Sequence, residues 1–503
     1  MLAAAMVFCS LLLSPLQVEG GQLQRYVVVV DAGSTGTRAH VFSFGEHLHQ
    51  KLPSWQEIGT NWTSPGLHTF VDSQNNGALE QYLETVISFS EALVPEHQRS
   101  KTPILFWATA GMRLISDEQA ENILSTCRNK LQDSSLLFRD SMARVISGAE
   151  EAKLAWIAAT YLHGDWPPVQ QTSSNTACKI TSDETRESPD DDTCHFAPGG
   201  KHHRQPQMQR MTSTGILEMG GASMQVAISI PSQCSGAREN LEKKNDFMRI
   251  ETGNENSVVL YAKSYLGFGM RAAQKKFLKN MEMKNIASPC HDEDEESDIN
   301  NDNLSKCSEE IEKELTGSIS EVSFLKKCQV SLEVEQVRSK EPMDLIVYAT
   351  ENFQHVFRFF LGKKHPWDKA SDSSNDTPWN GKAIGQSEIN RFIENVNRCR
   401  RPIPFGFRFC EMNIKDAVNF YQGILARRLK RNCFAGAYIL EVIEAVLGFD
   451  AIAGENMGTL KLIPTSTIDR TKLEWALGAT VWATSGAERE VNLKWVEAGF
   501  GLD

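Results

Sequence analysis

The stretch YVVVVDAGSTGTR, residues 26–38, decides the fold of this 503-residue chain because a second stretch, GILEMGGASMQV at residues 215–226, repeats its pattern. In each stretch an apolar run with strand character ends near a carboxylate, a glycine follows two positions after the acid, and a second apolar run begins. The acids, Asp31 and Glu218, lie 218 − 31 = 187 residues apart. One such segment alone is compatible with an ordinary glycine-turn hairpin. Two copies predict two related halves whose turns face each other across a cleft.

The two turns suit a phosphate chain held against a metal ion. Glycines let backbone N–H groups approach phosphate oxygens, and the hydroxyls of Ser34, Thr35 and Ser223 can add donors. An acid at the end of the strand can orient a divalent cation or its waters. We therefore expect a single phosphate chain to bind between the turns.

Length and charge limit the function classes. A chain of 503 residues is too long for one compact core, so two large lobes with insertions are expected. The formal net charge of −12 argues against a nucleic-acid partner, which needs a basic surface. A small polyanion can still bind where a cation and local donors offset the repulsion.

Several features favour the lumen of the secretory pathway or the outside of the cell. Residues 1–21 fit a cleaved signal peptide, with an uncleaved anchor as the alternative because the stretch before the apolar run lacks Lys and Arg. No later segment reaches eighteen consecutive apolar residues, so we expect no transmembrane body. Without Cys9, ten cysteines remain (11 − 1 = 10), an even number that fits disulfides, and no tight CxxC pair indicates zinc. Glycosylation acceptors occur at Asn61, Asn303 and Asn375.

Strands and helices alternate between residues 54 and 161, which predicts an α/β lobe. The pattern predicts helices over 77–93 and 117–131 and a strand over 103–108. Polar insertions are expected near 165–214, 290–307 and 371–385, and the acidic 290–307 stretch lacks the ligand spacing of an EF-hand. Further helical patterns cover 387–397, 414–429, 436–446 and 473–484.

Between the two turns lie ATAGMRL, residues 108–114, and ISGAEEAKLAWIAATYL, residues 146–162. Together with the turns, these segments resemble the ordered regions of the apyrase family, the ecto-nucleoside triphosphate diphosphohydrolases of the actin-like ATPase superfamily. Weaker matches follow at 261–269, 348–353, 433–440 and 475–478. The resemblance implies an α/β fold of two actin-like (ribonuclease H-like) lobes with an interdomain active-site cleft. It places a signal peptide at 1–21, the first lobe at 22–150 plus 472–503, and the second lobe at 151–471.

The resemblance also implies hydrolysis of nucleoside tri- and diphosphates and assigns the residues. Glu151 would be the base that activates water, Ser223 and Gln225 would position that water, and Thr109 would contact the transferring phosphate. Asp31 and Glu218 would hold Ca²⁺ or Mg²⁺ through its water shell. Phosphate binding would fall to Gly33, Ser34, Thr35, Gly36, Arg38, Gly220, Gly221, Ala222 and Ser223. Tyr348 and Phe353 are candidates for stacking on the base, although core packing is the stronger interpretation of both residues.

Two positions depart from the family pattern. Glu218 stands where the family commonly has Asp, and Ala152 stands where a Gly usually follows the catalytic glutamate. Outside the motif, Glu151 would read as a solvent-facing glutamate on a helix. Cys410 with Cys433 is a candidate disulfide, while Cys178 and Cys194 could close the first insertion.

Other functions stay open at this point. One is a nucleoside diphosphatase of the secretory pathway with a narrow base preference. A polyphosphate or guanosine-pentaphosphate phosphatase of the same superfamily is disfavoured by the signal and by residues 108–114, and a sugar kinase is disfavoured because a water-activating Glu151 would waste the nucleotide. A catalytically silent binding protein on the same scaffold is the alternative from another class. Nucleobase preference and oligomeric state do not follow from the sequence.

Overall fold

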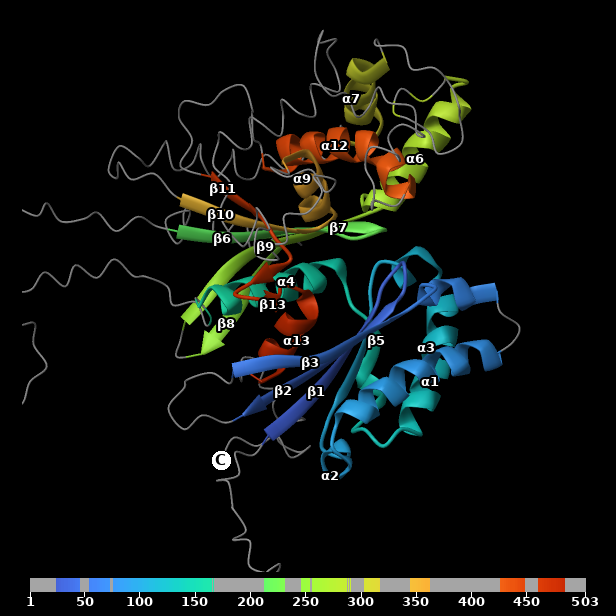
Figure 1. The fold of residues 1–503 in the computed structure, drawn as a ribbon, viewed down its shortest axis with the longest axis vertical. Helices are drawn as coiled ribbons and strands as arrows, with labels where there is room; N and C mark the ends of the chain where they lie inside the picture. The colour runs from blue at the N-terminus through green and yellow to red at the C-terminus, as the bar shows by residue number, and fades with distance from the viewer. Residues whose placement is uncertain are drawn as a thin grey trace, which may run out of the picture. The chain divides into compact units, whose positions relative to one another are not determined.

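The computed structural model describes residues 24–45, 54–72, 76–164, 166, 212–230, 246–253, 256–286, 288, 290, 303–316, 344–361, 426–447 and 460–484. Internal contacts divide these residues into two compact units, with the boundary between Ile146 and Ser147. Each unit is built on a β-sheet with helices, so the predicted α/β class is confirmed (Figure 1). The predicted insertions lie largely outside the described residues, as do the helices expected over 387–397 and most of 414–429.

The sheet of the first unit has the strand order β3-β2-β1-β4-β5. Its strands are β1 (Gln24–Ala32), β2 (Thr37–Gly45), β3 (Ser54–Thr63), β4 (Ile104–Ala108) and β5 (Ala143–Val145). β1, β2 and β3 run antiparallel, and β4 and β5 continue the sheet parallel to β1. The valine run of β1 predicts a strand buried on both faces, and residues 27–30 are fully buried.

Two helices cover one face of this sheet: α1 (Asn76–Leu93) and α3 (Asp117–Gln132). Both confirm the helices expected from the apolar periodicity. Leu83 and Ile123 pack from these helices onto Val28, Val30 and Phe106 of the strands. Shorter elements are η1 (Leu67–Asp72), α2 (Glu96–Arg99), η2 (Met112–Leu114) and η3 (Asp140–Met142).

The sheet of the second unit has the order β8-β9-β7-β6-β10-β11. Its strands are β6 (Thr212–Met219), β7 (Ser223–Ile230), β8 (Phe247–Gly253), β9 (Asn256–Leu266), β10 (Asp344–Glu351) and β11 (Leu460–Pro464). The odd-numbered β6 residues Leu217 and Met219 share a core with α6 (Met270–Met283), α7 (Asn303–Glu314), α9 (Asn352–Leu361) and α12 (Ala426–Leu447). These helices therefore cover one face of the sheet (Figure 1).

The helix α4 (Gly148–His163) packs against β6, β7 and β9, and α13 (Trp475–Thr484) packs against α4 (Figure 1). These two helices approach closely at Gly478, where an added Cβ would lie 1.8 Å from the Leu154 carbonyl oxygen. We expected residues 472–503 to join the first lobe, whereas α13 groups with the second unit. The short strands β12 (Thr467–Ile468) and β13 (Thr471–Lys472) form a separate hairpin before α13.

The two sheets repeat one arrangement, as the duplicated sequence pattern predicts. The order β3-β2-β1-β4-β5 corresponds to β9-β7-β6-β10-β11, with β8 added at the edge. In each unit the hairpin comes first, followed by a parallel strand next to it. Asp31 and Glu218 therefore occupy the same position in two copies of one fold.

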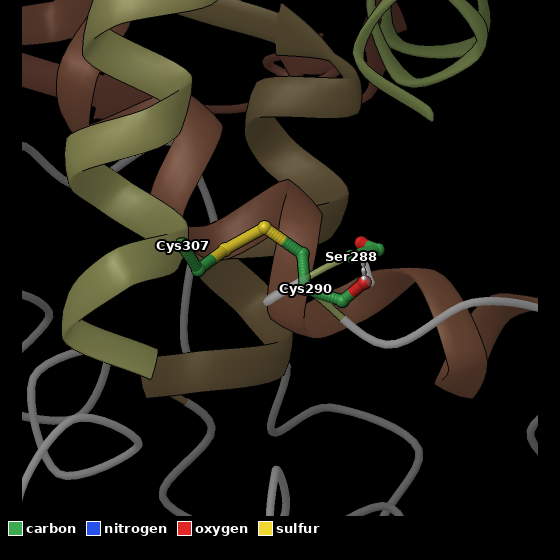
Figure 2. Close-up of a disulfide and its surroundings, with 3 residues drawn as sticks. All are labelled: Ser288, Cys290 and Cys307. Atoms are coloured by element: carbon green, nitrogen blue, oxygen red, sulfur yellow. Dashed lines mark hydrogen bonds between the residues drawn. A yellow bond between two sulfur atoms is a disulfide. The ribbon is translucent and has the colours of Figure 1, made fainter. Parts of the chain in front are cut away.

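Cys290 and Cys307, which lie 17 positions apart in the sequence, form a disulfide (Figure 2). Beside it, the Ser288 hydroxyl donates to the Cys290 carbonyl oxygen. Cys127 on α3 is a free, buried thiol, so the even number of cysteines does not mean that each one pairs. Burial raises the pKa of the Cys127 thiol to about 12, which keeps it protonated and unreactive. Cys178, Cys194 and Cys410 lie outside the described residues, so the Cys178–Cys194 and Cys410–Cys433 pairings stay predictions.

Among the described residues, no helix is both long enough and apolar enough to span a membrane.

Replacing both Cys290 and Cys307 by alanine should lower the free energy of unfolding by roughly 3 kcal/mol, because the disulfide restricts a loop of about this size in the unfolded chain. Denaturant unfolding of the purified full chain measures the change. A Cys127→Ala variant, which keeps the disulfide, serves as the cysteine control. A double variant as stable as the parent would contradict a stabilising role for this disulfide.

Candidate functional site

The turn of the first unit joins β1 to β2. Asp31, partly buried, is the penultimate residue of β1, and the Gly33 N–H donates to the Gly36 carbonyl oxygen at 2.9 Å. The Thr109 N–H donates to the Ala32 carbonyl oxygen at 3.1 Å, which holds the residue after β4 beside the turn. The structure thus brings the predicted phosphate contact Thr109 next to the predicted phosphate-binding residues 33–36.

Close backbone packing fixes the shape of this turn. A Cβ on Gly66 would lie 2.4 Å from the Ser34 carbonyl oxygen, and one on Gly111 would lie 2.9 Å from the Ser34 Cα. A Cβ on Gly36 would lie 2.6 Å from the Thr63 carbonyl oxygen. These distances are too short for a side chain, so glycine is required where the neighbouring segments meet the turn.

Arg38 lies directly opposite Asp31 in the β1–β2 register. Directly opposed residues project to the same face of a sheet, so the guanidinium and the carboxylate share one side. This placement fits the predicted role of Arg38 as a phosphate contact beside the turn.

The turn of the second unit, between β6 and β7, has the same geometry. The partly buried Glu218 lies opposite Gln225, and the Gly220 N–H donates to the Ser223 carbonyl oxygen at 3.0 Å. The glycine two residues after the acid therefore donates to the residue three positions later in both turns. Similar sequence has produced matching hairpins.

The carbonyl groups of the second turn are bound from behind by the start of α6. Backbone N–H groups of Met270 and Arg271 donate to the carbonyl oxygens of Gly220 and Gly221, each at 3.0 Å, and the Gly267 N–H donates to the Ala222 oxygen at 2.8 Å. In a planar trans peptide the C=O and the following N–H point in opposite directions. The N–H groups of residues 221–223 therefore point away from α6, as an anion site requires.

Two supports of this turn were not predicted from the sequence. Gly269 lies so close that an added Cβ would be 2.4 Å from the Ala222 and Ser223 nitrogens. The Asn352 amide donates to the Met219 carbonyl oxygen at 2.7 Å. Both residues lie in segments that match the apyrase family weakly, 261–269 and 348–353. This weak match was the only sequence feature that could have pointed to them.

Ser223 and Gln225 form a buried polar pair. The Gln225 amide nitrogen donates to the Ser223 hydroxyl oxygen at 2.6 Å, and it lies 3.4 Å from the Ser264 hydroxyl oxygen. The Ser223 and Gln225 residues are only 2% and 1% exposed. A serine hydroxyl can accept and donate at once, so the bond from Gln225 uses only its accepting side.

Glu151 lies in the first turn of α4. Its neighbour Glu150 belongs to a capping box: the Ser147 N–H donates to the Glu150 carboxylate at 2.9 Å, and the Glu150 N–H donates to the Ser147 hydroxyl at 3.1 Å. Glu151 is only 7% exposed, so the solvent-facing alternative is wrong. The positive end of the helix dipole favours a carboxylate here.

The helix that carries Glu151 covers the face of the sheet on which Glu218 and Gln225 lie. The Trp156 indole N–H donates to the Thr214 carbonyl oxygen of β6 at 3.0 Å. Glu218 alternates with the core residues Leu217 and Met219, so its side chain projects to the α4 side. Ala152, the departure from the family glycine, is fully buried within α4.

Tyr348 and Phe353 lie in the interior of the second unit. Phe353 is fully buried in its core, and Tyr348 is 3% exposed, with its hydroxyl 2.7 Å from the His163 Nδ1. These positions favour core packing over stacking on a base.

Comparison with known proteins gives a consistent result. A profile of the GDA1/CD39 (nucleoside phosphatase) family matches residues 18–333. Probable apyrase 6 of Arabidopsis thaliana is 27% identical over 96% of this chain and 77% of its own. Nucleoside-diphosphatase mig-23 of Caenorhabditis elegans is 25% identical over 93% of this chain and 79% of its own. The crystal structure of a Neospora caninum nucleoside triphosphate hydrolase matches with a TM-score of 0.51 at 13% identity, covering 95% of both chains, which supports the expected two-lobed actin-like fold.

Substitution of Gly269 by alanine should lower the free energy of unfolding by about 1–3 kcal/mol, because the new Cβ would push on the backbone nitrogens of the second turn. The matched control is Gly220→Ala, whose Cβ would meet only the Ser223 oxygen at 3.7 Å, an ordinary contact. Thermal and denaturant unfolding of both variants measure the difference. Equal stability of the two variants would contradict the close approach at Gly269.

Proposed function

Since the chain belongs to the GDA1/CD39 nucleoside phosphatase family, we propose that Glu151 activates the water that attacks the terminal phosphoryl group of a nucleoside tri- or diphosphate. Hydrolysis of nucleoside tri- and diphosphates is the activity that the family and the apyrase relatives support. The observation that carries the assignment of Glu151 is its burial at the start of α4, on the same face of the sheet as the second turn.

The reaction needs little covalent help from the protein. The water gives a proton to the Glu151 carboxylate, its oxygen bonds to the terminal phosphorus, and the bridging P–O bond breaks. The products are inorganic phosphate and a nucleotide that is one phosphate shorter, without a phosphoenzyme. A positioned carboxylate base contributes about 10²- to 10⁴-fold in rate, and oriented donors stabilise the charge on the phosphoryl oxygens.

The residues around each turn take complementary roles in this mechanism. Backbone N–H groups of residues 34–36 and 221–223 contact the phosphate oxygens, since the N–H groups of Gly33 and Gly220 close the turns. Arg38 and Thr109 add donors from the first unit. The Ser223–Gln225 pair fits the water-positioning role because the hydrogen bond at 2.6 Å fixes the hydroxyl oxygen. The family resemblance assigns the cation to Asp31 and Glu218, which stand at equivalent positions of the two sequence repeats.

The activity depends on a divalent cation, and the donor chemistry of this chain fits one. Asp31 and Glu218 offer carboxylate oxygens, the donors that Ca²⁺ and Mg²⁺ prefer, from equivalent positions at the ends of β1 and β6. When bound, the cation would offset negative charge on the phosphates. Contact through water would absorb the extra methylene of Glu218, a shift of about 1.5 Å relative to Asp.

We place the reaction in the lumen of the secretory pathway or outside the cell. The Cys290–Cys307 disulfide supports this location, because such bonds persist in oxidising compartments. A nucleoside diphosphatase with a narrow base preference is the second candidate, favoured by the nucleoside-diphosphatase relative. Phosphate release from a panel of nucleoside tri- and diphosphates separates the two candidates, and the absence of release from every nucleotide would leave the silent binding protein.

Glu151→Gln should reduce phosphate release from ATP and ADP by about 10²- to 10⁴-fold, because an amide cannot accept the proton of water. Glu150→Gln is the matched control: it is the same change one residue earlier, and glutamine also completes a capping box. Steady-state phosphate release and thermal unfolding of both variants give the answer. An active Glu151→Gln protein would overturn the assignment of the base.

A chelator such as EDTA should abolish phosphate release by the intact enzyme, because the phosphates would lose the cation that offsets their charge. Adding back Ca²⁺ or Mg²⁺ separately should restore release and identify the preferred ion. The asparagine and glutamine variants of Asp31 and Glu218 should need higher cation concentrations for half-maximal rate. An unchanged requirement in both variants would remove these residues from the cation site.

A further inference from the structure

We propose that the indole N–H of Trp62 donates to the phosphate bound by the first turn and so helps to position the substrate. The inference rests on the proposed function, because it takes residues 33–36 as a phosphate site. Trp62 lies on β3, outside the segments that carry the family resemblance.

The register of the first sheet places Trp62 in line with the site. Arg38 lies opposite Asp31 on one side and opposite Trp62 on the other. Directly opposed residues project to the same face, so carboxylate, guanidinium and indole form one row across β1, β2 and β3. This row lies directly beside the turn that begins after Asp31.

The nitrogen edge of the indole lies against the turn itself. A Cβ added to Gly36 would be 2.5 Å from Trp62 Nε1 and 2.8 Å from Trp62 Cε2. These two atoms belong to the pyrrole part of the ring, which therefore occupies the place where a side chain of residue 36 would lie. The absence of a side chain at Gly36 brings a ring N–H to the phosphate-binding backbone.

Trp62 is exposed in a way that core packing does not explain. It is 54% exposed, whereas Trp156, Trp475 and Trp482 are between 1% and 8% exposed. Leaving so much aromatic surface in water forgoes the free energy that burial of the ring would contribute. A ring beside the turn can instead be covered when substrate binds.

The equivalent positions in the second sheet carry side chains of a different kind from Arg38 and Trp62. The residue equivalent to Arg38 is Gln225, and the residue opposite Gln225 on β9 is Ser264. Gln225 and Ser264 can each donate and accept, which suits water, whereas Arg and Trp side chains only donate. The donor-only pair Arg38 and Trp62 suits a phosphate anion, which accepts.

Stacking of the exposed ring on the nucleobase is the competing role, and the two roles predict different substrate patterns. A donor to phosphate acts on every nucleotide alike, because all of them carry the same phosphates. A stacking ring discriminates between purines and pyrimidines and tolerates replacement by phenylalanine.

The test measures kcat and KM of the full-length enzyme for ATP, GTP and UTP in Trp62→Phe, Trp62→Ala and Trp62→His. We expect Phe and Ala to lower kcat/KM by about tenfold, by the same factor for all three nucleotides, as loss of a hydrogen bond to a charged group predicts. The histidine variant, which keeps a ring N–H, should recover part of the loss. Trp55→Phe, the same change at the other end of β3, controls for a general loss of aromatic packing.

Wild-type kinetics in Trp62→Phe would overturn the proposal. So would a loss confined to Trp62→Ala and graded by base, which would assign the ring to stacking, or a loss in Trp62→Phe that tracks a lowered unfolding temperature. A wild-type enzyme that releases no phosphate would contradict the proposed function instead, so the two failures are distinguishable.

Discussion

The hydrogen bond from a glycine N–H to the carbonyl oxygen three residues later closes both turns, and the geometry of the site depends on it. This bond sets the register that places Arg38 beside Asp31 and Gln225 beside Glu218. In the second unit, backbone N–H groups at the start of α6 donate to carbonyl oxygens of this turn. The N–H groups of the turn therefore point away from α6. The proposed phosphate site would thus follow from how the peptide groups are oriented, with few charged side chains needed.

Two copies of one fold have diverged where chemistry differs. The backbone of the hairpins is shared, whereas the side chains opposite the acids are Arg38 in one unit and Gln225 in the other. The cationic donor Arg38 suits a phosphate anion. The Gln225 amide, which donates to the Ser223 hydroxyl, suits water. Two adjacent glutamates differ similarly: Glu150 completes the cap that starts α4, and Glu151 is buried, as its proposed role in proton transfer requires.

The sequence predicts the features that local patterns encode. The valine run of β1, the acid-glycine spacing and the apolar periodicity of α1 and α3 were sufficient for the strands, the turns and the α/β class. What it did not reveal depends on contacts between distant segments: the approach of Gly269 to Ala222 and the bond from Asn352 to Met219. A glycine or an asparagine leaves no periodic signal, and an aromatic residue in a motif looks the same whether it meets a base or the core. The unpaired Cys127 shows similarly that an even cysteine count does not decide which thiols pair.

The close approach of Gly478 to Leu154 links the end of the described chain to α4, the helix that carries Glu151. Gly478 on α13 follows Glu151 on α4 by 478 − 151 = 327 residues in the sequence. Because a chain leaves the ribosome from its N-terminus, α4 is synthesised long before the helix that packs on it. A nascent or truncated chain therefore carries α4 without the helix that packs on it at Leu154 and Ala158.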